Sequence, residues 1–252
     1  INREEGLWQW LAELEQQGIR GMAIPHNSNA SKGMMFPDSD SSGKPVDKAY
    51  AKKRENFERA IEMMQTKGNS EVHRKFWSAD EFADFENWDV ANIAGTVAKE
   101  DWMLQYEYAR SALKHGLKLG KELGVNPYKF GVVGSTDSHT GLATAEEDNF
   151  FGKHSGVEPE AGRWNHVAIE AQLDPDLSIL GWQQAAAGYA GVWASENTRE
   201  ALFDAMRRKE VYATTGSRMT VRFFGGWEVT DDDLRTRMPA EVGYSKGVPM
   251  GG

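Results

Sequence analysis

The sequence has 252 residues, of which 40% are hydrophobic, enough for one large α/β domain or two small ones with a sizeable core. Its formal net charge of -9 argues against a nucleic-acid backbone as the main partner, because phosphate binding needs Lys and Arg clustered on one face. The absence of cysteine excludes disulfides and thiolate metal sites, so any metal ion must be held by His, Asp or Glu.

No uninterrupted apolar run reaches the length of a membrane span, about eighteen residues. The first residues, INREEGLWQW, also lack the basic and then apolar pattern of a signal peptide. We therefore expect a soluble protein of the cytoplasm or the periplasm.

The first predicted elements are a helix, a strand and a second helix. Residues 4–17 carry Leu and Trp at helical spacing and are followed by Gly18, which favours a helix end. Residues 19–26, IRGMAIPH, are short and apolar, which predicts a buried strand that ends at His26. A long loop rich in Ser, Asn, Gly and Pro leads to a helix from about Ala49.

The middle of the chain repeats this order. Residues 58–65, ERAIEMMQ, either end the second helix or form a strand, and Ser78 is expected to cap a helix that begins in SADEF. Residues 100–123 show the strongest helical periodicity in the chain and are closed by Gly124. The segment KFGVVGSTDSH at 129–139 then predicts a second buried strand with a polar end.

Residues 140–164 form another long polar loop in this interpretation. A helix capped by Asn197 or Thr198 follows, and VYATTG and MTVRFFGGWEV are expected to be strands. The last segment, EVGYSKGVPMGG, predicts no helix. Stretches rich in Trp, such as GLWQW, FWSADEF and GRWNHV, are expected in the core, although they could also serve as platforms on which sugars stack.

Polar residues end both predicted strands. In a parallel α/β sheet the carboxyl ends of the strands share one edge, so His26, Asp137 and His139 should converge. Alternate residues of a strand point to the same side, so Asp137 and His139 can face one centre while Ser138 faces away. A carboxylate and an imidazole in this arrangement are typical of a metal site.

Simpler interpretations of the same residues remain open. Asp137 could be a turn former or a helix cap, and His26 could hydrogen-bond the loop backbone. His154 and Lys153 lie in a polar loop and suit either plain surface or contact with a substrate. A serine hydrolase is disfavoured because no G-x-S-x-G motif occurs, and phosphate-binding loops are disfavoured because no G-x-G-x-x-G motif follows a strand.

Five blocks of the sequence carry a resemblance to a known family. They are AIPHNSN at 23–29, GSTDSHTG at 134–141, EEDNFFGKH at 146–154, the long segment at 193–227 and GVPMGG at 247–252. Together they resemble domain-of-unknown-function family 3604, which looks like a branch of the PHP (polymerase and histidinol phosphatase) superfamily of metal-dependent phosphoesterases. The resemblance implies an α/β fold that is part of a distorted (β/α)7 barrel, similar to a TIM barrel, with extra loops and C-terminal strands.

The resemblance also implies functional residues. His26, Asp137 and His139 match metal-ligand positions of the superfamily, whose sites hold one to three divalent ions, often manganese, zinc or iron. Lys153, His154 and Arg199 are candidate catalytic residues that would neutralise substrate oxyanions or protonate a leaving group. Weaker candidates near the same edge are Glu62, Gln65, Lys67, Glu71, Asp148 and Asn149.

The sequence departs from the superfamily in one respect. The superfamily begins with a His-x-His pair, and this chain contains none. We therefore expect residues 1–252 to be a single α/β domain that forms the C-terminal portion of a larger barrel, truncated at both ends. The missing portion would supply further metal ligands, and this piece alone could be inactive.

The predicted function is hydrolysis of a small phosphate or sulfate ester by a metal-activated water. The expected partner is thus a small anionic ester. One alternative is a domain without catalysis that binds a metal or an anion. Another is an amidohydrolase-like enzyme that cleaves C–N bonds, which would share the ligands but need a carboxylate base.

Overall fold

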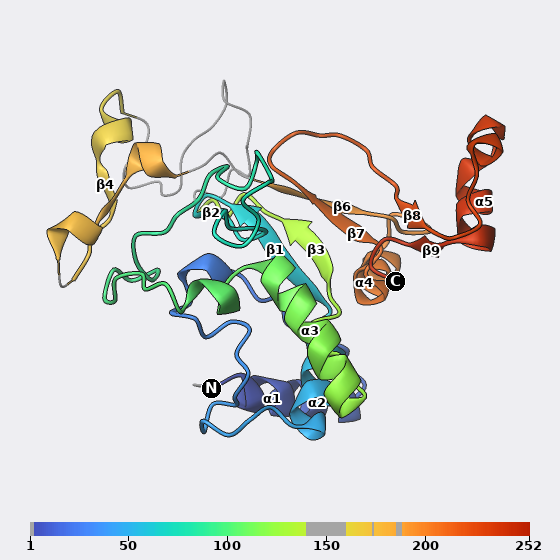
Figure 1. Ribbon diagram of the computed structural model, residues 1–252, viewed down its shortest axis with the longest axis horizontal. Coiled ribbons are helices and arrows are strands. Elements are labelled where there is room, and N and C mark those ends of the chain that lie inside the picture. Colours follow the sequence, from blue (N-terminus) through green and yellow to red (C-terminus); the bar gives the residue numbers. More distant parts are fainter. Residues whose placement is uncertain (1–2, 140–159, 173, 185–187) are drawn as a thin grey trace.

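The computed structural model describes residues 3–139, 160–172, 174–184 and 188–252. The chain forms helices and short strands in mixed order (Figure 1). The helices are α1 (Glu4–Gln16), α2 (Lys48–Phe57), α3 (Ala109–Leu123), α4 (Arg199–Arg208) and α5 (Pro239–Lys246). The strands are β1 (Ala60–Gln65), β2 (Gly68–Asn69), β3 (Gly131–Gly134), β4 (Val167–Ile169), β5 (Ile179–Leu180), β6 (Tyr189–Val192), β7 (Val211–Thr214), β8 (Phe224–Gly225) and β9 (Val248–Pro249).

A small sheet lies at the centre of the molecule. Its order is β2-β1-β3, with β1 and β3 parallel and β2 antiparallel to β1. The antiparallel pair β6 and β7 lies beside β3, where the amide of Gly188 donates to the carbonyl of Ser135 at 2.8 Å. The carboxyl ends of β1 and β3 therefore meet at one edge, which is the edge on which the predicted site depends.

The two faces of this sheet are covered by different helices. Ile61 of β1 and Val132 of β3 face a core that contains Trp8 of α1, Phe57 of α2 and Leu119 of α3. On the other face, Ala60 and Val133 pack with Val211 of β7, Val192 of β6 and Met206 of α4. Figure 1 shows α1 and α2 gathered at the lower end of α3, and α4 beside β7. Alternation along β1 and β3 thus sends neighbouring side chains into separate layers.

The expected (β/α)7 barrel is wrong for this chain. The described residues form one three-stranded sheet and three two-stranded pairs, and none of these sheets closes on itself. A barrel of this kind requires parallel strands joined by helices, but β2 and β6 pair antiparallel with their neighbours. Only β1 and β3 form the parallel pair that the repeated helix and strand pattern predicts.

The predicted strand at 19–26 is not a regular strand. The segment runs alongside β1 with two backbone hydrogen bonds, from Ala23 N to the carbonyl of Phe57 and from Glu62 N to the carbonyl of Pro25. Proline has no N–H to donate, which limits further pairing. The segment nevertheless runs in the direction of β1, so residues 26–29 reach the same edge as the ends of β1 and β3.

Several helices agree with the sequence pattern. Helix α1 matches the predicted span, Thr198 caps α4 by accepting from Ala201 N, and Gly124 closes α3 in the left-handed conformation with φ 74°. Residues 58–65 were expected to end the second helix or to form a strand, and most of them form the strand β1.

Three expectations about helices are corrected. Helix α3 begins at Ala109 rather than near residue 100. Residues 78–87 are turns, in which the Asp80 carboxylate accepts from Phe82 N, so Ser78 caps no helix. The last segment, 241–252, was expected to lack a helix, but residues 241–246 belong to α5, which begins at Pro239, a residue that suits the first helical turn.

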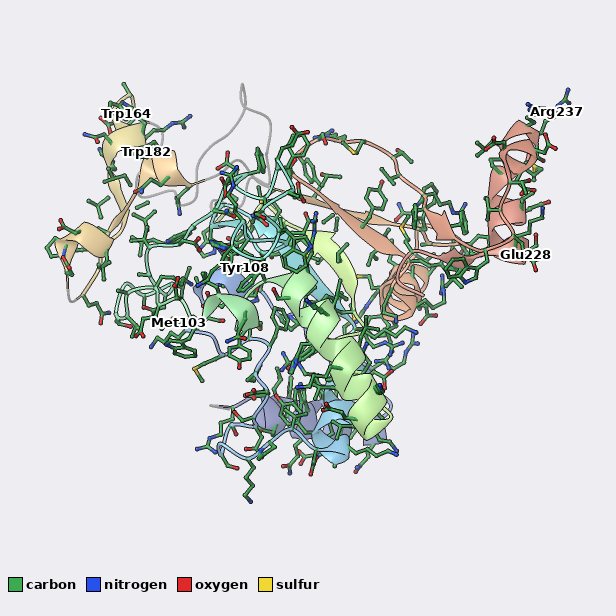
Figure 2. All side chains as sticks on the ribbon, in the orientation of Figure 1. Met103, Tyr108, Trp164, Trp182, Glu228 and Arg237 are labelled. Atoms are coloured by element: carbon green, nitrogen blue, oxygen red, sulfur yellow. The ribbon has the colours of Figure 1, made fainter. Side chains whose placement is uncertain are left out.

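Two parts of the chain lie away from the central sheet (Figure 1). The pair β4 and β5 is at one end, and β8, β9 and α5 are at the other. Figure 2 shows Trp164 and Trp182 on the first of these parts, where they are 60% and 63% exposed. Tryptophans are thus divided between core, as at Trp8, and surface. No described helix is long and apolar enough to cross a bilayer.

Candidate functional site

Asp137 and His139 lie together just beyond the end of β3. Nε2 of His139 is 3.2 Å from Oδ1 of Asp137. The geometry differs from the predicted strand, because β3 ends at Gly134 and Asp137 has a left-handed φ of 44°. Aspartate tolerates this conformation better than most residues. The pair is therefore made by a turn and not by strand alternation.

The separation of these two atoms is that of a hydrogen bond between imidazole and carboxylate, and it is also compatible with a shared metal ion. Ligand atoms about 2.0–2.2 Å from one ion, at tetrahedral or octahedral angles, lie about 3.0–3.5 Å apart. The Asp137 oxygen and the His139 nitrogen fall within that range. The Asp137 and His139 side chains are 25% and 56% exposed. The donor set of one oxygen and one nitrogen fits zinc, manganese or iron.

His26 does not join this pair. It is exposed, and its Nδ1 lies 3.4 Å from the carbonyl oxygen of Ile24. Over the described ranges, no group of three or more His, Asp or Glu side chains is placed to hold a metal ion. The sequence thus places His26 at the correct edge of the sheet, but the structure does not bring it to Asp137 and His139.

At this edge of the sheet, buried and half-buried polar side chains link the ends of the strands. Gln65 at the end of β1 donates to Oδ1 of Asn27 at 2.9 Å, and Ser135 after β3 donates to Oε2 of Glu62 at 2.7 Å. Lys67 donates through Nζ to the hydroxyl of Ser70, which donates to Oδ1 of Asn29 at 3.0 Å. The four side chains at 65, 67, 29 and 70 are at most 1% exposed. They form a fixed floor beneath the edge.

Glu62 of β1 accepts a hydrogen bond at Oε2 but at no other carboxylate oxygen among the described residues. Its side chain is buried, with 7% exposed, and Oε1 has no hydrogen-bond partner among the described residues. A buried carboxylate oxygen without a partner is costly, and such groups occur where a site serves a function. Of the weaker candidates, Glu62 thus has an acceptor atom left for a donor or a cation.

Sequence reasoning missed the partners of these residues. The sequence pattern does not distinguish these partners from ordinary loop residues, although each follows an apolar segment within a few positions. They are Asn27, Asn29, Ser70 and Ser135. Asn27 also has a left-handed φ of 59°, as Asp137 does at the neighbouring strand end. An Asn or Asp directly after a buried segment was the available signal, because these residues allow the sharp turn.

Two other candidates lie elsewhere. Glu71 pairs with Arg110 through Oε1 at 2.6 Å, so its carboxylate is taken up in a surface ion pair. Arg199 is exposed at the start of α4, which follows β6. The last residue of β6, Val192, pairs with Val211, which lies against Gly131 at the amino end of β3. The chain therefore enters α4 from the edge of the sheet opposite Asp137.

The remaining candidates are Lys153, His154, Asp148 and Asn149. All four lie outside the described residues. The structure describes the other candidates, which are His26, Glu62, Gln65, Lys67, Glu71, Asp137, His139 and Arg199.

The fold and this edge define an α/β protein with polar side chains gathered at the carboxyl ends of two parallel strands. The chain matches a family model described as a protein of unknown function, DUF3604, over residues 2–252, and it belongs to this family. No curated protein and no solved structure matches the sequence significantly.

Proposed function

We propose that this protein is a metal-dependent hydrolase of a small phosphate or sulfate ester, related in its chemistry to the PHP superfamily. The observation that carries the proposal is the contact of Asp137 and His139 beyond β3, with an O to N distance suited to one divalent ion. The resemblance of the GSTDSHTG block to the superfamily supports the same pair as ligands.

The residues present have distinct roles in this proposal. A divalent ion held by Asp137 and His139 would supply a Lewis acid that makes bound water nucleophilic near neutral pH. Asp137, in its left-handed turn, fixes the direction of the carboxylate, and His139 supplies a nitrogen ligand. Two residues before Asp137, the hydroxyl of Ser135 donates to Glu62 of β1 and so ties the start of the ligand segment to the sheet, as supporting hydrogen bonds do in metal sites.

The oxyanion of the substrate needs a cation besides the metal. Arg199 is not proposed for this role because its helix is entered from the opposite edge of the sheet. Lys153 and His154 stay candidates on the grounds of the family resemblance alone.

A second candidate function is a domain that binds a metal or an anion without catalysis. The number of ligands favours this binding function, because the described part of the chain brings only two possible ligand side chains together, Asp137 and His139. Two protein ligands hold a divalent ion weakly, whereas catalytic zinc sites have three.

The two candidates are separated by combining metal content with activity. The protein is loaded with manganese, zinc or iron and assayed with 4-nitrophenyl phosphate, 4-nitrophenyl sulfate and a 4-nitroanilide. Ester hydrolysis that depends on metal and falls about 100-fold or more in Asp137→Asn and His139→Ala supports the hydrolase. Metal uptake without turnover supports the binding domain, and cleavage of the anilide alone favours a C–N hydrolase.

The chain offers a matched control for these variants. His166 and Glu160 form another exposed pair of imidazole and carboxylate, 2.8 Å apart, but they follow no strand of the central sheet. His166→Ala should leave metal content and activity unchanged. A loss equal to that of His139→Ala would show that any surface histidine gives the effect.

A further inference from the structure

A cavity lies on the outer side of α3, and neither Asp137 nor His139 is among its lining residues. Its volume is about 710 Å³, within the range of about 300–1,000 Å³ typical of small-molecule sites. Among the described residues its wall consists of one face of α3 and two short segments, with Phe76, Trp77, Tyr106, Lys114, His115 and Lys118 as the main side chains. The cavity therefore combines aromatic rings with cationic groups.

The charge of this wall is opposite to that of the whole chain. Lys114 and Lys118 lie one turn apart on α3, and the described lining contains no carboxylate, although Asp38 lies next to it and accepts from the hydroxyl of Tyr106 at 3.2 Å. Lys118 is 4.0 Å from Glu122, and Lys114 has no carboxylate within ion-pair distance in the described part of the chain. Burial lowers the pKa of His115, against the opposing effect of the Asp38 carboxylate. The two lysines thus supply the positive charge.

The aromatic side of the cavity is held in place. Phe76 and Trp77 pack edge to face, with ring centroids 6.4 Å apart, and their backbone amides donate to the carbonyl of His73. His73 is fixed in turn by Asp89, which also accepts from Tyr108. Figure 2 shows Tyr108 at the upper end of α3. Phe76 remains 40% exposed, so a ring face is available to a ligand.

We propose that this cavity binds a small acidic sugar, with its sulfate or carboxylate between Lys114 and Lys118 and its ring on the Phe76 and Trp77 side. Aromatic side chains offer an apolar face to the C–H groups of a sugar, while Gln105 and Ser111 in the same wall offer hydrogen bonds to hydroxyls. A long polyanion is disfavoured because the cationic surface is only one helical turn long and the net charge is -9. The inference does not depend on the proposed hydrolase.

Binding is tested by calorimetry on the full chain without added metal, with galactose 6-sulfate, glucuronate, galactose and inorganic sulfate as probes. Both acidic sugars should bind at least about tenfold more tightly than galactose or sulfate, and binding should weaken with salt. Lys114→Glu and Lys118→Glu should each weaken it about tenfold or more. Lys121→Glu, on the same helix but outside the lining, is the control and should have little effect.

The contribution of the rings is tested with Trp77→Ala, which should weaken the acidic sugars without changing the affinity for sulfate. Trp77→Tyr keeps a ring and should retain most of the binding, which guards against a folding defect in the alanine variant. Equal affinity for galactose 6-sulfate and inorganic sulfate, or an equal loss in Lys121→Glu, would each overturn the acidic-sugar proposal. Absence of binding to all four probes would also overturn it.

Discussion

The hydroxyl of Ser135 donates a hydrogen bond of 2.7 Å to Oε2 of Glu62 and so links the carboxyl ends of the parallel strands β3 and β1. Removing it in Ser135→Ala leaves a buried carboxylate with less hydrogen bonding. We expect the free energy of unfolding to fall by about 1–3 kcal/mol, measured by urea denaturation. Ser135→Thr keeps the hydroxyl and should lose less. Equal stability of the alanine variant and the wild type would contradict this role.

Tyr108 is predicted to control the titration of Asp89. Burial by itself would raise the pKa of Asp89, but hydrogen bonds from His73 and Tyr108 outweigh it and hold that pKa below its usual value. A lowered carboxyl pKa contributes stability above the unfolded-state pKa, and this contribution is lost as the pH falls through the folded-state pKa. Tyr108→Phe should therefore raise the pKa of Asp89 and lower stability by about 1–3 kcal/mol near neutral pH.

The carboxyl resonance of Asp89, followed by NMR through an acid titration, measures this change. The stability difference between wild type and Tyr108→Phe should shrink below the ordinary aspartate pKa, because the protonated side chain no longer holds the charge-assisted bond. A difference that stays constant down to acid pH would show that Tyr108 acts through packing alone.

Arg54 and Glu58 form a buried ion pair, with Nε 2.8 Å from Oε2 and both side chains less than 10% exposed. Arg54→Met would leave the buried Glu58 carboxylate without its cation, so we expect the free energy of unfolding to fall by about 3–5 kcal/mol near neutral pH. Burial raises the pKa of Glu58 while Arg54 opposes that rise, so the variant should raise the pKa further. A carboxyl group with a raised pKa destabilises the folded state when the pH is above its folded-state pKa. This destabilisation declines as the pH falls below that pKa and is gone below the unfolded-state pKa.

Urea denaturation of Arg54→Met at about pH 7 and about pH 5 tests this sign, with the larger deficit expected at the higher pH. Replacing both partners, in Arg54→Met with Glu58→Leu, should recover part of the loss because no buried charge remains. A deficit that grows on acidification would exclude this explanation.

Two glycines with similar backbone conformations should respond differently to alanine. Gly68 and Gly124 have φ values of 84° and 74°. At Gly124 the nearest atom to an added Cβ is Nζ of Lys48 at 3.8 Å, whereas at Gly68 it is the carbonyl oxygen of Glu86 at 2.1 Å. Gly124→Ala should cost about 1–2 kcal/mol from the left-handed conformation alone. Gly68→Ala should lower the thermal midpoint considerably more, and equal effects would contradict the close approach.

How far the sequence predicts the fold depends on where the stabilising contacts are made. Helices α1 and α4 could be predicted because spacing and caps such as Thr198 are local signals. The start of α3 could not, because Glu107 is held outside it by Lys99 Nζ at 2.5 Å and by the amide of Gly33. Hydrophobic periodicity also does not show the direction of a strand. The antiparallel pairing of β2 and β6 could therefore not be predicted, and the predicted barrel is wrong.

The same distinction applies to the site. The Asp-x-His spacing indicates Asp137 and His139, and the structure places them in contact, although through a left-handed turn. The buried partners Asn29 and Ser70 and the half-buried Ser135 depend on contacts between distant segments, which spacing does not encode. His26 reaches the predicted edge but not the pair, because position at an edge does not fix the direction of a side chain.

The most direct test of the metal site is the metal content of the wild-type chain and of Asp137→Asn, measured by elemental analysis of protein and buffer after equilibrium dialysis against manganese, zinc or iron, because two protein ligands hold an ion too weakly for removal of excess ion. The proposal predicts that the wild type retains a divalent ion and that the variant, which loses the carboxylate ligand but keeps its shape, loses most of it. The same metal content in both proteins, or none in the wild type, would contradict a metal site at Asp137 and His139.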